Sequence, residues 1–312
     1  MRVGQNPAKN IQRVVTSKRI TVAVLSYIPT LHGYYAEALD VLKFCLESIW
    51  QNSDLPFDLM VFDNGSCSQT RDFLNQAQVD KKIQYLVLSQ KNVGKGGAWN
   101  TMFSSAPGEI IAYCDGDAYL YPGWLSACVE VLETYPQVGM VTARPMRSYF
   151  GEFNTATVQW AKKTRGVKIE EGQLIPYEQY QEFANTMGYS SSKVKKIYAE
   201  TKDTRLTYKN LPVFVGANHF QFVGWKKILN QFVPFEMSKP LGQVQMLDAK
   251  INEAGYLRLM TAEPLVQNMS NRVPDKPVRT DQPKVNRIAD IAFIKKILLW
   301  LHDRIFRLYF EG

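Results

Sequence analysis

Strand-like and helix-like segments alternate along residues 19–143, and this alternation limits the possible folds more than any other feature of the chain. Short apolar runs rich in β-branched residues predict the strands, and apolar residues at helical spacing predict the helices. The expected strands are 19–27, 57–62, 83–88, 110–114 and 139–143, and the expected helices are 36–50, 70–78 and 124–134. The pattern is typical of an α/β protein with a doubly wound, mostly parallel sheet, which binds ligands at the carboxyl ends of its strands.

The rest of the chain divides into segments of different character. Residues 144–210 are polar and rich in lysine, and we expect a helical insertion that covers one face of the sheet. Residues 211–268 return to a strand-and-helix pattern, and residues 269–287 are expected to form a linker, since they are rich in proline and charge. Residues 288–312 carry an apolar stripe that predicts an amphipathic helix. The expected elements are helices at 177–187, 191–201, 223–232 and 244–254 and a strand at 212–217.

Charge and composition restrict the partners and the compartment. The net charge of +8 and the pI of about 9.1 favour anionic ligands. The basic and aromatic pattern of common nucleic-acid-binding modules is missing, so we expect no nucleic-acid partner. The four cysteines form no CxxC pair, which indicates reduced thiols in a cytoplasmic protein rather than disulfides or a zinc site.

Membrane contact is open at one place in the sequence. The sequence shows no signal peptide and no uncharged apolar run of the roughly 20 residues that a membrane span needs. The predicted helix at 288–310 either lies on the inner face of a membrane as a peripheral contact or packs against the domain or a partner chain.

Two aspartates one residue apart follow the predicted strand at 110–114. Asp115 and Asp117, with Gly116 between them, are expected at the carboxyl end of a buried strand. Like charges this close raise each other's pKa unless a cation lies between them. A divalent ion that also holds a diphosphate accounts for the pair, and an Asp-Gly turn is the structural alternative.

Two further motifs lie at the ends of predicted elements. The segment FDNGS ends the strand at 57–62 and reads as a turn with a helix N-cap. The segment NVGKGGAWN enters a helix, but it is no Walker A loop because Gly96 follows Lys95. Its glycines would let the backbone approach a nucleotide, and a plain glycine-rich turn is the alternative.

The ordered set of these segments resembles a GT-A glycosyltransferase of the large inverting family 2. The segments that carry the resemblance are VAVLSY, FDNGS, NVGKGGAWN, DGD with YPGWL, VGANHFQFVGWKKIL and LDAKINEAGY. The resemblance covers residues 19–268 and implies a GT-A domain with a nucleotide-sugar-binding half at 19–143 and an acceptor-side half at 211–268. It implies transfer of a sugar from a UDP- or GDP-sugar to a hydroxyl of a glycan or lipid-linked acceptor, with inversion, as in polysaccharide biosynthesis.

The resemblance also assigns roles in donor binding. Asp63 reads the base of the donor, a role that a carboxylate can perform by accepting an imide N–H. Ser26 and Tyr27 line the same nucleotide pocket, and Tyr27 offers a face for the base. Lys95 answers the phosphate charge, and Asn100 fixes the glycine-rich loop of the donor site. The structural alternative for Asp63 is capping of the helix that follows.

The metal site follows from the same resemblance. Asp117 ligates Mn²⁺ or Mg²⁺, and Asp115 contacts the ribose or reaches the metal through water. The ion neutralises charge on the diphosphate as the sugar–phosphate bond breaks. His219 is a candidate for the metal shell or for a contact with the diphosphate, and a satisfied, partly buried histidine is the alternative.

The catalytic base is the role for which this chain departs from the family pattern. An inverting transfer needs a carboxylate to take the proton of the acceptor hydroxyl. The family supplies it from an acidic pair before the helix that reads LDAKINEAGY, but this chain has Gln243 and Val244 there. Asp248 is the leading candidate and Glu236 the second, while a solvated helix residue is the alternative for Asp248.

Two other functions remain as interpretations. A chain that lost its base would bind a nucleotide sugar without transferring it. A nucleotidyltransferase is a third interpretation, but its glycine-rich loop after the first strand is missing, since Ile28-Pro29-Thr30 stands there.

Overall fold

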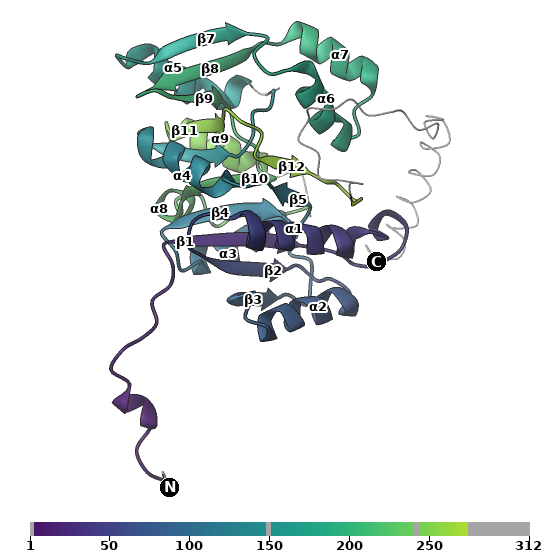
Figure 1. The fold of residues 1–312 in the computed structure, drawn as a ribbon, viewed down its shortest axis with the longest axis vertical. Coiled ribbons are helices and arrows are strands. Elements are labelled where there is room, and N and C mark those ends of the chain that lie inside the picture. The colour runs from purple at the N-terminus through teal and green to yellow at the C-terminus, as the bar shows by residue number, and fades with distance from the viewer. Residues whose placement is uncertain (1–2, 148–150, 240–243, 274–312) are drawn as a thin grey trace.

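The computed structural model describes residues 3–147, 151–239 and 244–273 (Figure 1). Ten strands form one sheet in the order β3-β2-β1-β4-β10-β6-β11-β9-β8-β7. The predicted α/β class with a doubly wound sheet is therefore confirmed. Within these residues, no helix combines the length and apolar character that crossing a bilayer requires. The expected helix at 288–312 and most of the linker at 269–287 lie outside the described residues.

The first half of the sheet is parallel, as the alternation predicts. Its strands are β1 (Ile20–Ser26), β2 (Phe57–Asp63), β3 (Tyr85–Leu88) and β4 (Ile110–Asp115). The helices that connect them are α1 (Ala38–Asn52), α2 (Ser68–Val79) and α3 (Gly94–Ser105). Because β1 and β4 are covered on both faces, nearly all of their side chains are buried.

The second half of the sheet mixes directions. Strand β10 (Gln221–Trp225) lies between β4 and β6 (Val138–Thr142), antiparallel to both, while β11 (Leu257–Thr261) runs parallel to β6. The helices here are α4 (Trp124–Thr134) and α9 (Gln245–Glu253), both as predicted, and the short α8 (Lys226–Leu229). A small separate sheet pairs β5 (Ala118–Leu120) with β12 (Val266–Asn268).

The prediction of a helix at 223–232 is wrong over its first residues. Gln221–Trp225 is a strand because it fills the gap between two neighbouring strands, and its first four residues are buried. Gly224 permits this close approach, since a Cβ there would lie 2.8 Å from the carbonyl oxygen of Gly139. A short apolar run cannot be assigned to strand or helix from its periodicity alone.

The polar insertion at 144–210 is not only helical. Its helices are α5 (Thr155–Lys163), α6 (Tyr177–Thr186) and α7 (Ser191–Glu200). The antiparallel strands β7 (Lys168–Gly172) and β8 (Asp203–Tyr208) add to β9 (Leu211–Val215) and extend the sheet at the top of Figure 1. The sequence did not indicate these strands because β7 is a charged edge strand without apolar alternation.

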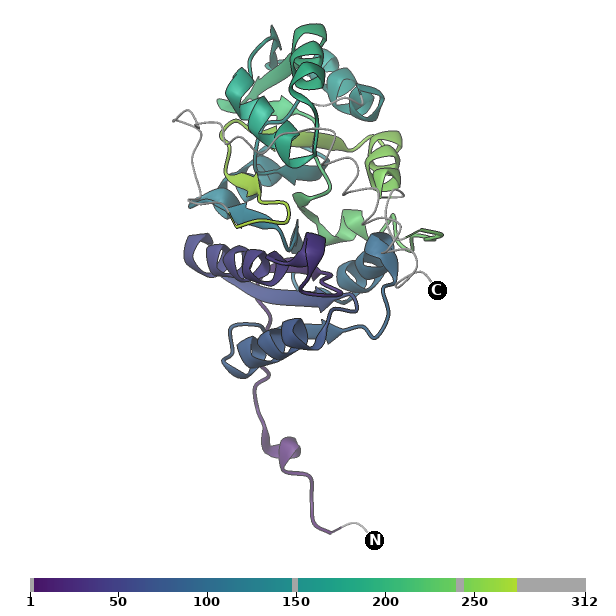
Figure 2. The same ribbon diagram turned by 90° about the vertical axis from the view of Figure 1, so that its right-hand side faces the viewer.

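Helices cover the two faces of the sheet unequally. Apolar residues of α1, α2 and α4 form one core against the sheet, and those of α3 and α9 form a second core on the other face. Figure 2 shows α1 and α3 on opposite sides of the parallel strands. The four cysteines are free and three of them are buried, so the expectation of unpaired thiols is confirmed.

Candidate active site

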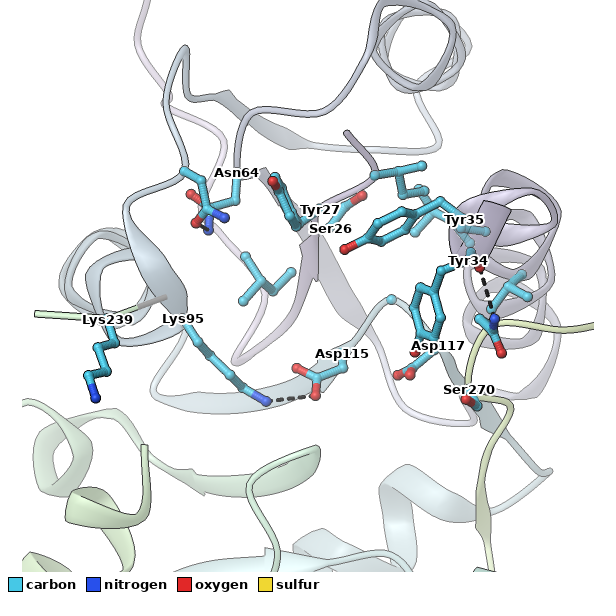
Figure 3. A pocket seen from close by; sticks show the side chains of 18 residues that line it. Ser26, Tyr27, Tyr34, Tyr35, Asn64, Lys95, Asp115, Asp117, Lys239 and Ser270 are labelled. Carbon is cyan, nitrogen blue, oxygen red and sulfur yellow. Dashed lines mark hydrogen bonds and ion pairs between the residues drawn. The ribbon is translucent and has the colours of Figure 1, made fainter. Parts of the chain in front are cut away.

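A cleft of about 710 Å³ opens at the carboxyl ends of β1 and β4 (Figure 3). Open α/β sheets place their ligands at this edge. Polar and aromatic residues that line the cleft are Ser26, Tyr27, Tyr34, Tyr35, Asn64, Asn92, Lys95, Asp115, Asp117, Lys239, Ser270 and Asn271. The cleft therefore brings together five of the residues proposed from the sequence, and it adds residues that the sequence did not single out.

Asp115 is held by two neighbours in the cleft. Lys95, in the first turn of α3, places its Nζ 2.6 Å from Oδ2 of Asp115. The hydroxyl of Tyr113 donates to Oδ1. Burial, and then the charge of Asp115, raise the pKa of Tyr113 well above its usual value, so this phenol remains a donor. The Nζ of Lys95 also lies 5.5 Å from the ring centres of Trp99 and Tyr113, so the lysine is fixed from several directions.

Asp117 is held less fully than Asp115, and the charge of Lys95 offsets only part of the shift in its pKa. Its Oδ1 is buried and has no hydrogen-bond partner within the described part of the chain. Burial, and then the charge of Asp115, raise the pKa of Asp117 to about 7. A buried, unpaired carboxylate oxygen is unfavourable on its own and fits a site for a cation.

The donor set fits a hard divalent cation shared with a phosphate ligand. In the three described segments, no group of three or more His, Cys, Asp or Glu side chains is placed to hold a metal. Asp115 and Asp117 therefore supply at most two carboxylates. Mg²⁺ sites of this kind commonly combine one or two carboxylates with substrate phosphates and water.

The two glycine-containing motifs join at one side of the cleft. The Asn64 amide donates to the main chain of Ser26, and its side-chain Oδ1 accepts from the Val93 amide at 2.9 Å. The Asn64 Nδ2 donates to Asn92 at 3.0 Å, so the turn after β2 is tied to the loop before α3. Gly65, with φ of +92°, allows this turn. The Ser26 hydroxyl is buried without a partner in the described residues and stays available to a ligand.

Three tyrosines form an aromatic wall. The rings of Tyr27 and Tyr35 lie 6.3 Å apart and those of Tyr34 and Tyr35 lie 5.1 Å apart, both edge to face. Burial raises the pKa of Tyr35 to about 12. In Figure 3, Tyr34 and Tyr35 lie across the cleft from Lys95, with the two aspartates between them. Asn271 donates to the main chain of Tyr34 at 2.8 Å, which places the end of the described chain against this wall.

Asp63 lies behind the cleft rather than in its lining. The carboxylate is fully buried, and its Oδ2 accepts from the Ser66 amide at 3.1 Å and from Nε of Arg71 at 3.3 Å. Ser66 precedes the N-cap residue of α2, Cys67, so this oxygen closes the turn before the helix and does not cap the helix. Its Oδ1 has no partner within the described segments, so a role in reading the base stays a prediction for this oxygen.

Asn100 does not reach the cleft. Its side-chain amide donates to the carbonyl of Phe235 at 2.9 Å, and its Oδ1 accepts from the Phe235 amide at 2.7 Å. The expected donor contact is therefore replaced by a support for residues 235–239, which end with Lys239 in the cleft lining. The sequence could not indicate this contact because the two partners are 135 residues apart.

His219 does not line the cleft, so its place in the metal shell or at the diphosphate stays a prediction. Its Nδ1 lies 3.2 Å from Oδ2 of Asp248, and it forms no metal-holding group with Asp115 and Asp117. The other oxygen of Asp248 accepts from Nη2 of Arg258 at 2.8 Å. Burial lowers the pKa of Arg258, and the charge of Asp248 opposes this shift. His219, Asp248 and Arg258 thus form a cluster of their own.

Neither candidate for the base lines the cleft. Asp248 is buried, with both oxygens engaged by its two neighbours. Glu236 is exposed on the segment that follows α8. The two aspartates beside Gly116 are the acidic side chains of the cleft lining within the described residues.

Glycosyltransferases are among the proteins whose sequences are similar to this chain. An uncharacterized glycosyltransferase of Nostoc sp. is 31% identical over 32% of this chain and 31% of its own length. The glycosyltransferase AglE of Haloferax volcanii is 23% identical over 39% of this chain and 45% of its own length. The chain thus spans less than half the length of either relative.

A solved structure and a family model complete the comparison. The mannosyltransferase PcManGT of Pyrobaculum calidifontis, solved with GDP-Man and Mn²⁺, is 17% identical over 79% of this chain and 55% of that chain, with a TM-score of 0.44. The model of glycosyl transferase family 2 matches residues 33–222, more than half of the chain. Since the match includes α1, the turn after β2, the loop before α3 and both aspartates of the cleft, this chain belongs to glycosyl transferase family 2.

Proposed function

We propose that the protein transfers a sugar from a nucleoside-diphosphate sugar to a hydroxyl group of a glycan or lipid-linked acceptor. The observation that carries this proposal is the unpaired, buried Oδ1 of Asp117 in a cleft that also holds Lys95. A diphosphate needs positive charge, and the cleft offers a lysine together with a place for a cation. Family membership supports the same reaction class.

Each side chain of the cleft has a role in this proposal. Tyr27 and the neighbouring tyrosines present a face on which a base can stack, and the buried Ser26 hydroxyl offers a hydrogen bond to the nucleoside. Lys95 binds the diphosphate by exchanging part of its contact with Asp115 for phosphate oxygens. A Mn²⁺ or Mg²⁺ ion bound by Asp117 and Asp115 would stabilise the negative charge of the leaving diphosphate.

The finer features of the reaction stay part of the proposal. Asp63 favours a uracil or guanine base, because its unpaired oxygen can accept an imide N–H. Inversion at the anomeric carbon follows if the acceptor attacks in line with the leaving diphosphate. A cytoplasmic location and a peripheral membrane contact through residues 288–310 are predictions that cell fractionation of full-length and truncated protein would test.

Turnover with a small panel of donors tests the proposal. UDP-glucose, UDP-N-acetylglucosamine and GDP-mannose are incubated with Mn²⁺, with and without glycan acceptors, and release of UDP or GDP is measured. We expect release that EDTA abolishes and that Asp117→Ala lowers at least 100-fold. Asp72→Ala, which alters an exposed aspartate on α2, is the matched control and should behave like wild type.

Two outcomes would contradict the transferase. The first is that no donor releases UDP or GDP and that Asp117→Ala binds UDP as well as wild type does. This result would contradict both the assigned site and the activity. Tight binding of UDP and Mn²⁺ by calorimetry, with neither transfer nor hydrolysis in a broad acceptor screen, would instead favour a nucleotide-sugar-binding protein.

A further inference from the structure

His219, which contacts Asp248, lies at the same edge of the sheet as the cleft. The carbonyl of Phe220, the residue after His219, accepts from the Asp115 amide at 2.7 Å. His219 is therefore the neighbour in sequence of a residue that is hydrogen-bonded to the main chain of the cleft residue Asp115. Strand β10 starts where β4 ends, because the two strands are antiparallel.

Asp248 is fixed by the buried guanidinium of Arg258. Its side chain is 6% exposed and that of Arg258 is 4% exposed. The guanidinium is itself held in place, because its Nη1 donates to the Phe153 carbonyl and to Oδ1 of Asn154, both at 2.9 Å. One oxygen of Asp248 contacts Arg258 and the other contacts His219, and the low exposure of the side chain limits its access to a substrate. A buried carboxylate in this arrangement can orient a neighbour but cannot deprotonate an acceptor itself.

His219 does not line the cleft either, but its side chain is more exposed than that of Asp248. Its side chain is 28% exposed. An ionised carboxylate beside Nδ1 favours the tautomer that carries its proton on Nδ1, so the lone pair lies on Nε2. The described part of the chain contains no partner for Nε2. A base oriented by a third group is the arrangement found repeatedly in enzymes that activate hydroxyl nucleophiles.

We infer that His219 is the general base of the transfer and that Asp248 is its positioning residue, an inference that rests on the proposed function. The Nε2 of His219 takes the proton of the acceptor hydroxyl while the acceptor oxygen forms a bond to the anomeric carbon. The bond from that carbon to the diphosphate oxygen breaks, and its electron pair leaves with the nucleoside diphosphate. The charge of Asp248 stabilises the imidazolium, which later gives its proton to water.

The other acids of the region fit this role less well. Asp115 accepts from Lys95 and Tyr113, and Asp117 belongs to the proposed cation site. Glu236 is exposed, and no described residue orients its carboxylate. His219 combines partial exposure with a fixed orientation. It would take the role of the acid that this chain lacks at Val244.

A variant that keeps the hydrogen bond to Asp248 separates the two roles. In His219→Asn, the side-chain amide can occupy the position of Nδ1 and still donate to Asp248, but the proton acceptor at Nε2 is gone. We expect kcat to fall between about 10² and 10⁴-fold, with the Kd for UDP and Mn²⁺ within threefold of wild type. His32→Asn, in an exposed loop, is the matched control and should retain full activity.

A second variant guards against a purely structural effect. His219→Ala leaves a space that imidazole can enter. We expect added imidazole to raise the transfer rate of this variant at least tenfold. For Asp248→Asn we expect kcat to fall with the donor KM unchanged. The ¹⁵N NMR signals of the His219 ring should show the proton on Nδ1 in the wild type and lose this preference in the variant.

Each outcome decides between the inference and the proposed function. Transfer by His219→Asn within threefold of wild type would overturn the role of His219 and leave the transferase standing. A product with retained anomeric configuration would do the same, because a base-assisted single displacement inverts. A wild-type protein that neither transfers nor hydrolyses any donor would overturn both.

Discussion

Replacing Asp117 by asparagine is expected to stabilise the metal-free protein at alkaline pH, although it damages the proposed site. Burial, and then the charge of Asp115, raise the pKa of Asp117 from 3.8 to about 7. The unfolded chain has the ordinary pKa, so between about pH 4 and pH 7 the folded state binds a proton that the unfolded state has lost. The free energy of unfolding therefore falls as the pH rises through this window and stays low above it.

The size of the effect follows from the same pKa difference. A change from 3.8 to about 7 corresponds to about 4 kcal/mol. Because Asp117 is half-buried rather than enclosed, water screens part of this cost, and we expect about 2 kcal/mol. Asparagine carries no charge at any pH, so Asp117→Asn should exceed the wild-type free energy of unfolding by this amount at about pH 8. At about pH 4.5 the difference should shrink to roughly half.

Urea unfolding in EDTA at the two pH values measures this difference. Asp72→Asn, which changes an exposed aspartate, is the control and should match wild type at both. Adding Mn²⁺ with UDP should then raise the stability of the wild type but not that of Asp117→Asn. A variant that is less stable than wild type at pH 8, or a difference that is the same at both pH values, would refute the assignment of a destabilising charge to Asp117.

Three further substitutions test other contacts of the structure. Lys95→Met should weaken UDP binding about tenfold in calorimetry; unchanged affinity would remove the lysine from the diphosphate site. Gly96→Ala would place a Cβ 2.5 Å from Sδ of Met237 and should cost about 1–3 kcal/mol in urea unfolding; the cost should largely vanish in a Met237→Ala background, and additive effects would speak against the clash. Arg147→Met removes the cation that lies 2.7 Å from the buried Asp203 and leaves this carboxylate only the amides of Leu174 and Ile175; it should cost about 3–5 kcal/mol, and a loss below 1 kcal/mol would contradict the importance of this ion pair.

The parallel half of the sheet could be predicted because local pattern and burial agree there. Strands such as Ile20–Ser26 and Ile110–Asp115 are mostly apolar and buried along nearly their whole length, since helices cover both of their faces. Helix Trp124–Thr134 begins after a Pro-Gly turn and carries a regular apolar face, so its limits could be predicted as well. In contrast, Lys168–Gly172 is a strand only because Asp203–Tyr208 lies beside it. That tertiary pairing leaves no periodic signal in the segment itself.

The same contrast separates the parts of the candidate site. Asp115 and Asp117 could be placed in the cleft because they follow a buried strand, and position along a strand is a local property. Tyr34 and Tyr35 carry no such signal. They lie between β1 and α1, and it is the path of this loop in space that brings them to the cleft. Lys239 depends on the bonds between Asn100 and Phe235, a contact that no local pattern encodes.

The cluster of His219, Asp248 and Arg258 shows what residue type alone cannot say about a candidate base. Asp248 could be singled out from the sequence because its place in helix α9 follows from the local pattern of residues. Whether that carboxylate can accept a proton depends on Arg258, which lies ten residues away on a different element and engages one of its oxygens. The contact with His219, from a third element, engages the other oxygen and leaves the imidazole as the exposed member of the cluster. The role of general base can therefore be assigned to the histidine only after three elements are packed together. The sequence contains each of these residues, but it does not show the contacts between them.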